Sequence, residues 1–201
     1  MSKAYIYLFD DIDSLSVDFV SENRNRLPVF RQQQCARYRQ EFDKNACVLA
    51  YLLLDKGLRE QFNIAPPFEF IYNEHGKPYL RDFPHIFFNI SHCKYGVVCT
   101  LADFEVGIDI QEVRPFDVDI ARRVCSENEL QQLSETDNPS RLFCKMWTKK
   151  ESYAKAKGIS AAGVLKRDLP DKDFFIQEYE NYYISLFGVN DVEIIAIKLP
   201  L

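Results

Sequence analysis

The order of apolar segments along the chain is the feature that most limits its possible folds. A strand-like run at 4–9 is followed by helical segments and further strand-like runs, and beyond about residue 103 the order is strands, helices and strands again. No repeat is visible by residue identity, and no Gly-, Ser- or Pro-rich linker separates the two parts. This order predicts an α+β fold of two similar halves, 1–103 and 104–201, packed as one compact unit.

Individual elements follow from periodicity and from capping residues. Ser126 with Glu129 three residues later is a capping box that starts a short helix. The runs 95–102 and 105–113 are predicted to pair as a hairpin across Asp103-Phe104. The other predicted strands are 4–9, 68–72, 86–90, 174–179, 182–187 and 192–198, and the predicted helices are 43–62, 139–157, two short ones within 116–133 and weaker ones in 16–27 and after Pro28.

Composition excludes several classes of protein. The longest apolar run, 47–54, is far shorter than the roughly 20 residues of a membrane span. With 25 Lys and Arg against 30 Asp and Glu, the net charge of −5 gives no attraction to nucleic acid. The start lacks a leader pattern, and the six cysteines form no Cys-x-x-Cys pair, so they are expected to stay reduced. We therefore expect a cytoplasmic protein that binds neither nucleic acid nor membrane.

Common catalytic motifs are absent from the sequence. It contains no Gly-x-Gly-x-x-Gly, no Gly-x4-Gly-Lys-Ser/Thr, no His-Glu-x-x-His and no Gly-x-Ser-x-Gly. Ser91 and His92 are adjacent at the end of a predicted strand, where neighbouring side chains point to opposite faces. The two residues are therefore not expected to act as a nucleophile and its base.

Two segments carry acidic and basic side chains with a regular spacing. Asp109 and Gln111 lie on one face of the strand 105–113, and paired side-chain oxygens suit Mg2+, although a polar strand face turned to solvent explains them equally well. Glu151 and Lys155 share a helical face with Trp147. Because the tryptophan indicates that this face packs, both charged groups are expected to be partly desolvated, and each then needs the other or a ligand as its partner. The alternative is an ordinary surface ion pair.

Two further segments have weaker signals. In the turn Gly76-Lys77-Pro78 the lysine is placed either to meet an anion or simply to be solvated. The strand Phe88-Asn-Ile-Ser-His92 ends in polar groups, where a histidine is often structural.

Taken together and in this order, the four segments resemble the motifs of the 4'-phosphopantetheinyl transferase family, in its larger two-halved class. That class has Gly-Lys-Pro, Phe-Asn-Ser/Ile-Ser-His, Gly-Ile-Asp-Ile-Glu and Trp-x-x-Lys-Glu-x-x-x-Lys. The resemblance implies two halves related by a pseudo-twofold axis, with the active site in the cleft between them. It also implies a monomer, because the two-halved class builds within one chain the site that the short class builds between subunits. The matching segments here are Gly76-Lys-Pro78, Phe88-Asn-Ile-Ser-His92, Gly107-Ile-Asp-Ile-Gln111 and Trp147-Thr-Lys-Lys-Glu-Ser-Tyr-Ala-Lys155.

The resemblance implies a reaction and its partners. The family moves 4'-phosphopantetheine from coenzyme A to a serine of an acyl or peptidyl carrier protein, with Mg2+, and releases adenosine 3',5'-bisphosphate. By this resemblance Asp109, Gln111 and Glu151 bind Mg2+. Glu151 takes the proton of the serine, directly or through water, and Lys155 neutralises the phosphate oxygens and supplies a proton to the leaving group.

The remaining assignments concern the coenzyme and follow from the same resemblance. Ser91 and His92 hold phosphates, and His92 is counted with Glu151 and Lys155 among the catalytic residues. Lys77 and Pro78 line the pocket for adenine and the 3'-phosphate, and Lys150 adds positive charge.

Two departures from the family pattern bear on this site. Gln111 stands where the family commonly has Glu, which removes one negative charge from the metal site and should weaken metal binding. The family often has Asp-x-x-Arg at the start of the long helix, but here the residues are Asp43-Lys-Asn-Ala46. The cation for the 3'-phosphate would then come from Lys44 or Arg31.

Two other functions fit the same residues. One is a non-catalytic binder of coenzyme A or of a carrier protein, and the other is an Mg2+-dependent hydrolase of nucleotide pyrophosphates. Carrier proteins are generally acidic, so docking on this acidic chain would need a local basic patch. Arg122-Arg123, with Phe116 and Val124 as apolar neighbours, is the expected place.

Overall fold

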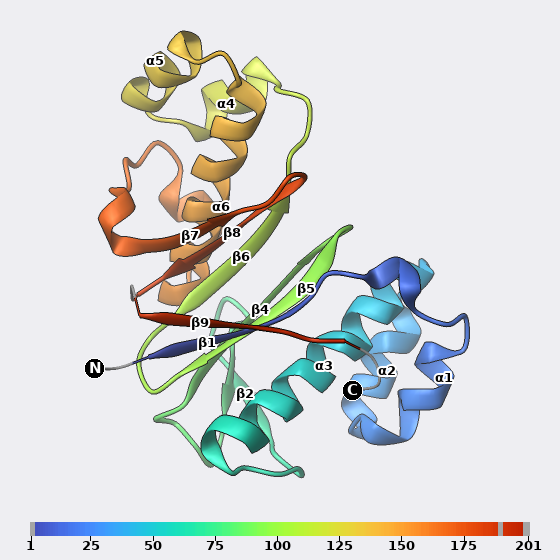
Figure 1. The fold of residues 1–201 in the computed structure, drawn as a ribbon. Helices are drawn as coiled ribbons and strands as arrows, with labels where there is room; N and C mark the ends of the chain where they lie inside the picture. The colour runs from blue at the N-terminus through green and yellow to red at the C-terminus, as the bar shows by residue number, and fades with distance from the viewer. Residues whose placement is uncertain (1–2, 189–190, 199–201) are drawn as a thin grey trace.

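The computed structural model describes residues 3–188 and 191–198, and it is an α+β fold (Figure 1). Three sheets have the strand orders β4-β5-β1-β9, β6-β8-β7 and β2-β3. The strands are β1 (Ala4–Phe9), β2 (Phe70–Tyr72), β3 (Pro78–Leu80), β4 (Phe87–Cys93), β5 (Gly96–Ala102), β6 (Gly107–Glu112), β7 (Phe174–Glu178), β8 (Tyr182–Phe187) and β9 (Val192–Ala196). The α-helices are α1 (Phe19–Asn23), α2 (Val29–Arg37), α3 (Glu41–Phe62), α4 (Val118–Val124), α5 (Glu127–Glu135) and α6 (Pro139–Lys157).

The long helix α3 covers one face of the first sheet and forms the core of the first half with it. Acidic Glu41 and Asp43 occupy its first turn, where they interact favourably with the helix dipole. Its last cap is Asn63, whose left-handed backbone (φ 55°) ends the helix before Pro66. Between these ends Leu49 and Leu53 are fully buried against the sheet.

A second apolar layer joins the two larger sheets. Ile6 of β1 and Val98 of β5 pack with Ile108 and Ile110 of β6 and with Ile184 of β8. Helix α6 packs on the opposite face of β6 and β8. The layers therefore run from α3 through both sheets to α6, as the two-halved fold predicts (Figure 1).

The expected hairpin between 95–102 and 105–113 is wrong. Strand β5 pairs with β4 and β1, whereas β6 pairs with β8 in the other sheet. All seven residues of β5 are buried, so the strand shows none of the alternation that would have identified its partners. Residues 103–106 connect the two halves instead of turning a hairpin.

The last strand returns to the first half. Residues 192–196 form β9, which pairs in parallel with β1, with Ile6 opposite Ile194. The division at residue 103 therefore places in the second half a strand that is part of the first half's sheet (Figure 1). Within the described residues, no helix is both long and apolar enough to cross a membrane.

Candidate active site

The two halves meet where β4 lies beside β6. Asn89 and Ser91, which alternate along β4, face β6, and the Asn89 Oδ1 atom accepts a hydrogen bond of 2.9 Å from the backbone N–H of Ile108. His92 points to the other face of β4, where its ring lies 6.2 Å from that of Phe42. The expectation that Ser91 and His92 point apart is confirmed, because each contacts a different half of the molecule.

Ser91, Asp109 and Lys155 form a closed polar triangle across this junction. The Asp109 Oδ1 atom accepts hydrogen bonds from Ser91 Oγ at 2.7 Å and from Lys155 Nζ at 2.6 Å, and Lys155 Nζ also lies 2.9 Å from Ser91 Oγ. Asp109 is only 4% exposed. Its other oxygen, Oδ2, is buried with no hydrogen-bond partner among the described residues. A buried carboxylate oxygen is costly without a partner, so this atom is available for a ligand.

A glycine brings α6 close enough to β6 to build this triangle. A Cβ atom on Gly107 would lie 2.2 Å from the backbone nitrogen of Ala156 and 2.2 Å from the backbone oxygen of Ser152. Both contacts are with helix backbone, which cannot rotate away. The glycine at this position is therefore required for the approach of the helix that carries Glu151 and Lys155.

Glu151 stands one turn before Lys155 on α6, half-buried, and it makes no hydrogen bond or ion pair with the described part of the chain. Burial raises the pKa of its carboxyl, and the negative charge of Asp109 raises it further, while Lys155 acts in the opposite direction. Glu151 is therefore within electrostatic range of Asp109 and is held in an environment that favours proton uptake.

The donors at this junction fit a hard divalent cation. Asp109 offers the unpartnered Oδ2 atom, Glu151 offers an unpaired carboxylate, and Gln111 follows Asp109 on the same face of β6. Among the described residues no three His, Cys, Asp or Glu side chains cluster as a metal site.

A cavity of about 260 Å³ opens on the other side of β4. It lies between α2, α3 and the β2–β3 hairpin, and Pro78 and His92 line it. Arg31 enters it from α2, and its Nε atom is buried without a hydrogen-bond partner, although Nη1 binds Gln34 at 2.6 Å. Desolvation and the Lys155 cation lower the pKa of His92.

Of the two cations proposed to replace the missing arginine at Ala46, the structure places Arg31 in this cavity. Ala46 also lines the cavity, so the Arg31 side chain on the neighbouring helix shares the cavity with the position where the family often has arginine. The Lys44 ammonium instead forms an ion pair of 2.5 Å with Glu41 on the same helix.

The structure does not bring Lys77 and Lys150 to the cleft. The buried Lys77 ammonium donates a hydrogen bond of 2.5 Å to the backbone oxygen of Ala156, near the end of α6, where carbonyl oxygens lack helical partners. Lys150 is fully buried on another side of α6, 2.9 Å from Glu129. In both cases an acceptor elsewhere in the fold determines where the lysine points.

We expect the buried Lys77 ammonium to make the protein more stable as pH rises above 8. Burial lowers the pKa of Lys77 to about 8, so between there and its ordinary value of 10.5 the unfolded chain binds more protons than the folded chain. Over this window wild type should gain up to about 3 kcal/mol of unfolding free energy that the Lys77→Met variant does not gain. Urea unfolding of both proteins at pH 7.5 and pH 10 measures this difference. Parallel pH profiles would contradict it.

A second and more apolar cavity, of about 460 Å³, lies beside Gln111. Trp147 and Phe143 of α6 line one side, and Ile120 and Val124 of α4 line the other. Arg122 and Arg123 on α4 are exposed. The two cavities thus open on different parts of the molecule, the smaller one beside β4 and the larger one beside the end of β6.

Sequence reasoning assigned no role to Asn89, which joins the two halves at the site. The available signal was its spacing of two from Ser91 on a predicted strand, which places both side chains on one face. Tyr38 and Tyr72, which line the smaller cavity, carry no such signal, because the loops and short strands that hold them have no clear periodicity.

Comparisons with known proteins identify the family of this chain. Residues 105–193 match the family model described as the 4'-phosphopantetheinyl transferase superfamily. The chain is 38% identical over 202 residues to the 4'-phosphopantetheinyl transferase gsp of Aneurinibacillus migulanus, and the match spans 98% of this chain and 79% of that protein. It is 27% identical over 159 residues to the 4'-phosphopantetheinyl transferase Sfp of Bacillus subtilis (strain 168), and this match spans 78% of this chain and 68% of that protein. The chain therefore belongs to the 4'-phosphopantetheinyl transferase superfamily and is a transferase enzyme.

Proposed function

We propose that this enzyme transfers 4'-phosphopantetheine from coenzyme A to a serine of an acyl or peptidyl carrier protein, with Mg2+, and releases adenosine 3',5'-bisphosphate. The observation that carries the proposal is the junction of β4, β6 and α6, where Asp109 has a buried, unpartnered oxygen beside Lys155 and within range of Glu151. Both halves of one chain supply this junction, which supports action as a monomer.

In the proposed mechanism the smaller cavity receives the nucleotide end of coenzyme A. Pro78 and His92 line it, and Arg31 presents an unpartnered Nε–H there, as binding of an anionic phosphate requires. Ser91, one residue from His92 but on the opposite face of β4, belongs to the polar triangle.

We expect the Arg31→Met variant to bind coenzyme A about 10- to 100-fold more weakly, because it loses a charge-assisted hydrogen bond to the 3'-phosphate. Dephospho-coenzyme A, which lacks that phosphate, should bind wild type and variant alike. Isothermal titration calorimetry measures both ligands. Lys44→Met is the matched control and should leave both affinities unchanged. An equal loss of affinity for the two ligands would show that Arg31 does not bind the 3'-phosphate.

Asp109, Glu151 and Gln111 are the residues that would hold Mg2+, whose chemistry when bound is to neutralise charge on the pyrophosphate. Phosphoryl transfer depends mainly on positioning and on charge neutralisation. Glu151, the acid with the raised pKa, accepts the proton of the attacking serine hydroxyl, a role that contributes about 10²–10⁴-fold. Lys155, fixed by Asp109 and Ser91, presents its ammonium to the phosphate oxygens of the leaving group and can supply its proton.

The amide at position 111 gives a direct test of the metal site. Gln111→Glu restores a negative charge beside Asp109 and should lower the Mg2+ concentration that gives half-maximal rate. Steady-state assays over an Mg2+ series measure the change, and Gln177→Glu, at a half-buried position of β7, controls for added charge. An unchanged Mg2+ dependence would place residue 111 away from the ion.

We propose that the carrier protein docks over the larger cavity. Its apolar walls include Ile120, Val124 and Phe143, and Arg122 and Arg123 on α4 could meet the acidic residues of a carrier. This arrangement would bring the carrier serine to the side of the triangle that Gln111 faces, while coenzyme A approaches from the other side.

Mass spectrometry of a panel of apo-carriers, incubated with the enzyme, coenzyme A and Mg2+, tests the proposed function. We expect one or more carriers to gain the mass of 4'-phosphopantetheine, and we expect the gain to disappear with a chelator. Binding of coenzyme A without any mass gain would indicate a non-catalytic binder. Release of adenosine 3',5'-bisphosphate from coenzyme A without a carrier would indicate a pyrophosphate hydrolase.

A further inference from the structure

We infer that Lys150 is a positioning residue, whose buried ammonium fixes the rotation of α6 that turns Glu151 toward Asp109. The inference rests on the role of Glu151 in the proposed function. Lys150 reaches neither cavity and does not touch the polar triangle. Any effect on transfer would therefore act through its neighbour in the chain.

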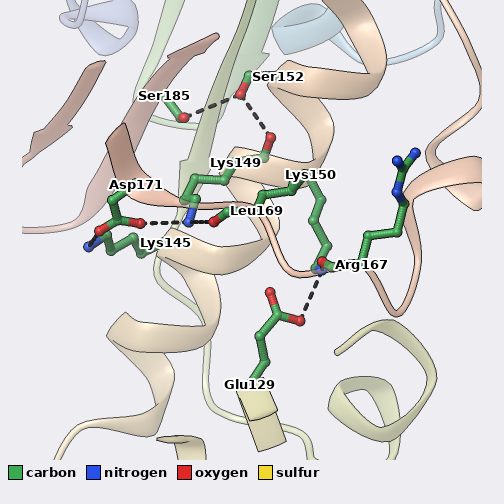
Figure 2. Close-up of polar contacts among 9 residues, drawn as sticks. All are labelled: Glu129, Lys145, Lys149, Lys150, Ser152, Arg167, Leu169, Asp171 and Ser185. Carbon is green, nitrogen blue, oxygen red and sulfur yellow. Dashed lines mark hydrogen bonds and ion pairs between the residues drawn. The ribbon is translucent and has the colours of Figure 1, made fainter. Parts of the chain in front are cut away.

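Side chains before and after Glu151 anchor the same turn of α6 in different directions (Figure 2). Lys149 donates to the backbone oxygen of Leu169 and lies 2.6 Å from Asp171. Ser152 Oγ lies 3.2 Å from Ser185 Oγ on β8. Lys150 takes a third direction, toward α5. Of the four consecutive residues 149–152, Glu151 alone has no side-chain partner within the described chain.

The contacts of Lys150 are buried and its acceptors are themselves fixed. Its ammonium lies 2.9 Å from Glu129 Oε2 and also donates to the backbone oxygen of Arg167 (Figure 2). Lys150 is fully buried and Glu129 is 6% exposed. The same Glu129 oxygen accepts the Ser126 N–H at 2.8 Å, and Ser126 Oγ donates to Asp168 at 2.5 Å. The ammonium therefore joins α6 to α5 and to the segment that follows α6. Both acceptors have little freedom to move.

Such a pair has a cost that points to a role besides stability. Two buried charges are often no more stabilising than apolar side chains of the same size, whereas their hydrogen bonds are directional. Successive residues on a helix are about 100° apart, so holding residue 150 also sets the direction of residue 151. A carboxylate lies about 6 Å from the helix axis, so a rotation of about 10° moves it by about 1 Å. Misplacement by that distance can cost about 100-fold in rate.

Three variants of the full chain separate positioning from stability. Lys150→Met removes the ammonium and leaves Glu129 buried without its cation. Glu129→Gln keeps an oxygen for the Ser126 N–H and for the lysine but removes the negative charge. The double variant Lys150→Met/Glu129→Gln has no charge at either of these two buried positions. For each protein we would measure the melting temperature, kcat, KM for coenzyme A and, by electron paramagnetic resonance, the affinity for Mn2+.

We expect rate and stability to dissociate across this series. Lys150→Met should melt lower and turn over about 10- to 100-fold more slowly, with KM for coenzyme A changed less than about twofold. Glu129→Gln should melt lower but keep most of its kcat, because the lysine still donates to Arg167 and to the amide oxygen. The double variant should regain melting temperature relative to Lys150→Met yet stay as slow. Mn2+ should bind several-fold more weakly to both proteins that lack the ammonium.

Arg141→Met is the matched control. Arg141 is also a cation of α6 that binds a carboxylate, Glu178 at 2.9 Å, and backbone oxygens, those of Tyr179 at 2.8 Å and Glu180 at 2.6 Å, but it lies ten residues before Glu151. We expect a lower melting temperature with wild-type kcat and Mn2+ affinity. A loss of kcat like that of Lys150→Met would show that removing any cation that anchors α6 slows transfer. That result would overturn the specific role of Lys150.

The result that overturns the inference is a double variant with wild-type kcat and Mn2+ affinity, or a kcat that simply follows melting temperature across the series. Failure of the proposed function would look different, because wild type itself would then transfer nothing to any carrier. If Lys150→Met does not fold, the double variant alone tests the inference, because it leaves neither member of the pair charged and unpartnered.

Discussion

Glu151→Gln should abolish transfer of 4'-phosphopantetheine while coenzyme A still binds. Glutamine has nearly the shape of glutamate but cannot accept the proton of the serine hydroxyl, so we expect turnover to fall by about 10²–10⁴-fold. Binding should persist, because the cavity proposed for the nucleotide is built by α2, α3 and the strands β2 to β4. Transfer followed by mass spectrometry and coenzyme binding followed by calorimetry measure the two effects separately.

The same variant should be at least as stable as wild type at neutral pH. The folded state raises the pKa of Glu151, so the ionised carboxylate destabilises the fold, and this cost is present at pH values above the folded pKa. Removing a charge that function requires should therefore leave the melting temperature unchanged or higher. Glu135→Gln, at an exposed position of α5, is the control and should alter neither rate nor melting temperature. Turnover retained in Glu151→Gln would remove this residue from the mechanism.

Gly107→Ala should lower both stability and transfer, although it adds a single methyl group. The new Cβ atom would lie 2.2 Å from backbone atoms of Ser152 and Ala156, so α6 has to move away from β6. Overpacking of this kind typically costs about 1–3 kcal/mol. Because Glu151 and Lys155 move with the helix while Asp109 stays on β6, we expect kcat to fall by on the order of 100-fold in the fraction that remains folded.

Gly163→Ala provides the comparison for that substitution. A Cβ atom on Gly163 would meet only the flexible end of Ile159, at 3.4 Å, and the backbone there is not left-handed. We expect a change in unfolding free energy of less than about 0.5 kcal/mol and no change in kcat. Urea unfolding and single-turnover assays on both variants check the pair. A Gly107→Ala protein that turns over normally would mean that α6 tolerates displacement from β6.

Residue spacing predicted which side chains share a face, and the structure brings several of them together. Asp109 on its strand and Lys155 on its helix were identified by periods of two and of four residues, and they are in contact. The directions of Lys77 and Lys150 could not be read in this way. Each ammonium goes to an acceptor that is remote in sequence, the Ala156 carbonyl for one and Glu129 for the other. Such partners are set by tertiary packing, between the halves for Lys77 and within the second half for Lys150, and local spacing carries no information about it.

The strand pairing was predicted wrongly for a related reason. A strand buried on both faces has no alternation of polar and apolar residues, so β5 and β6 looked like partners because they are adjacent in sequence. Two helix ends, by contrast, depend on local signals and were predicted correctly: the Ser126–Glu129 capping box starts α5, and α6 ends at Lys157 before the cap Gly158. The start of the long helix at Asp43 was wrong, because α3 begins at Glu41 after the cap Gln40. For the missing arginine, the sequence offered Arg31 and Lys44 as candidate replacements, and the fold shows a difference between them: Arg31 Nε is buried without a partner, whereas Lys44 pairs with Glu41.

The return of β9 to the side of β1 has a consequence for biosynthesis. On the ribosome, residues 4–9 emerge long before residues 192–196, so one border of the first sheet waits for synthesis of the second half before its hydrogen bonds are complete. Until then an apolar β1 is open to pairing with other nascent chains. The first sheet therefore contains strands from both halves, and its β1–β9 border forms only when the second half is present.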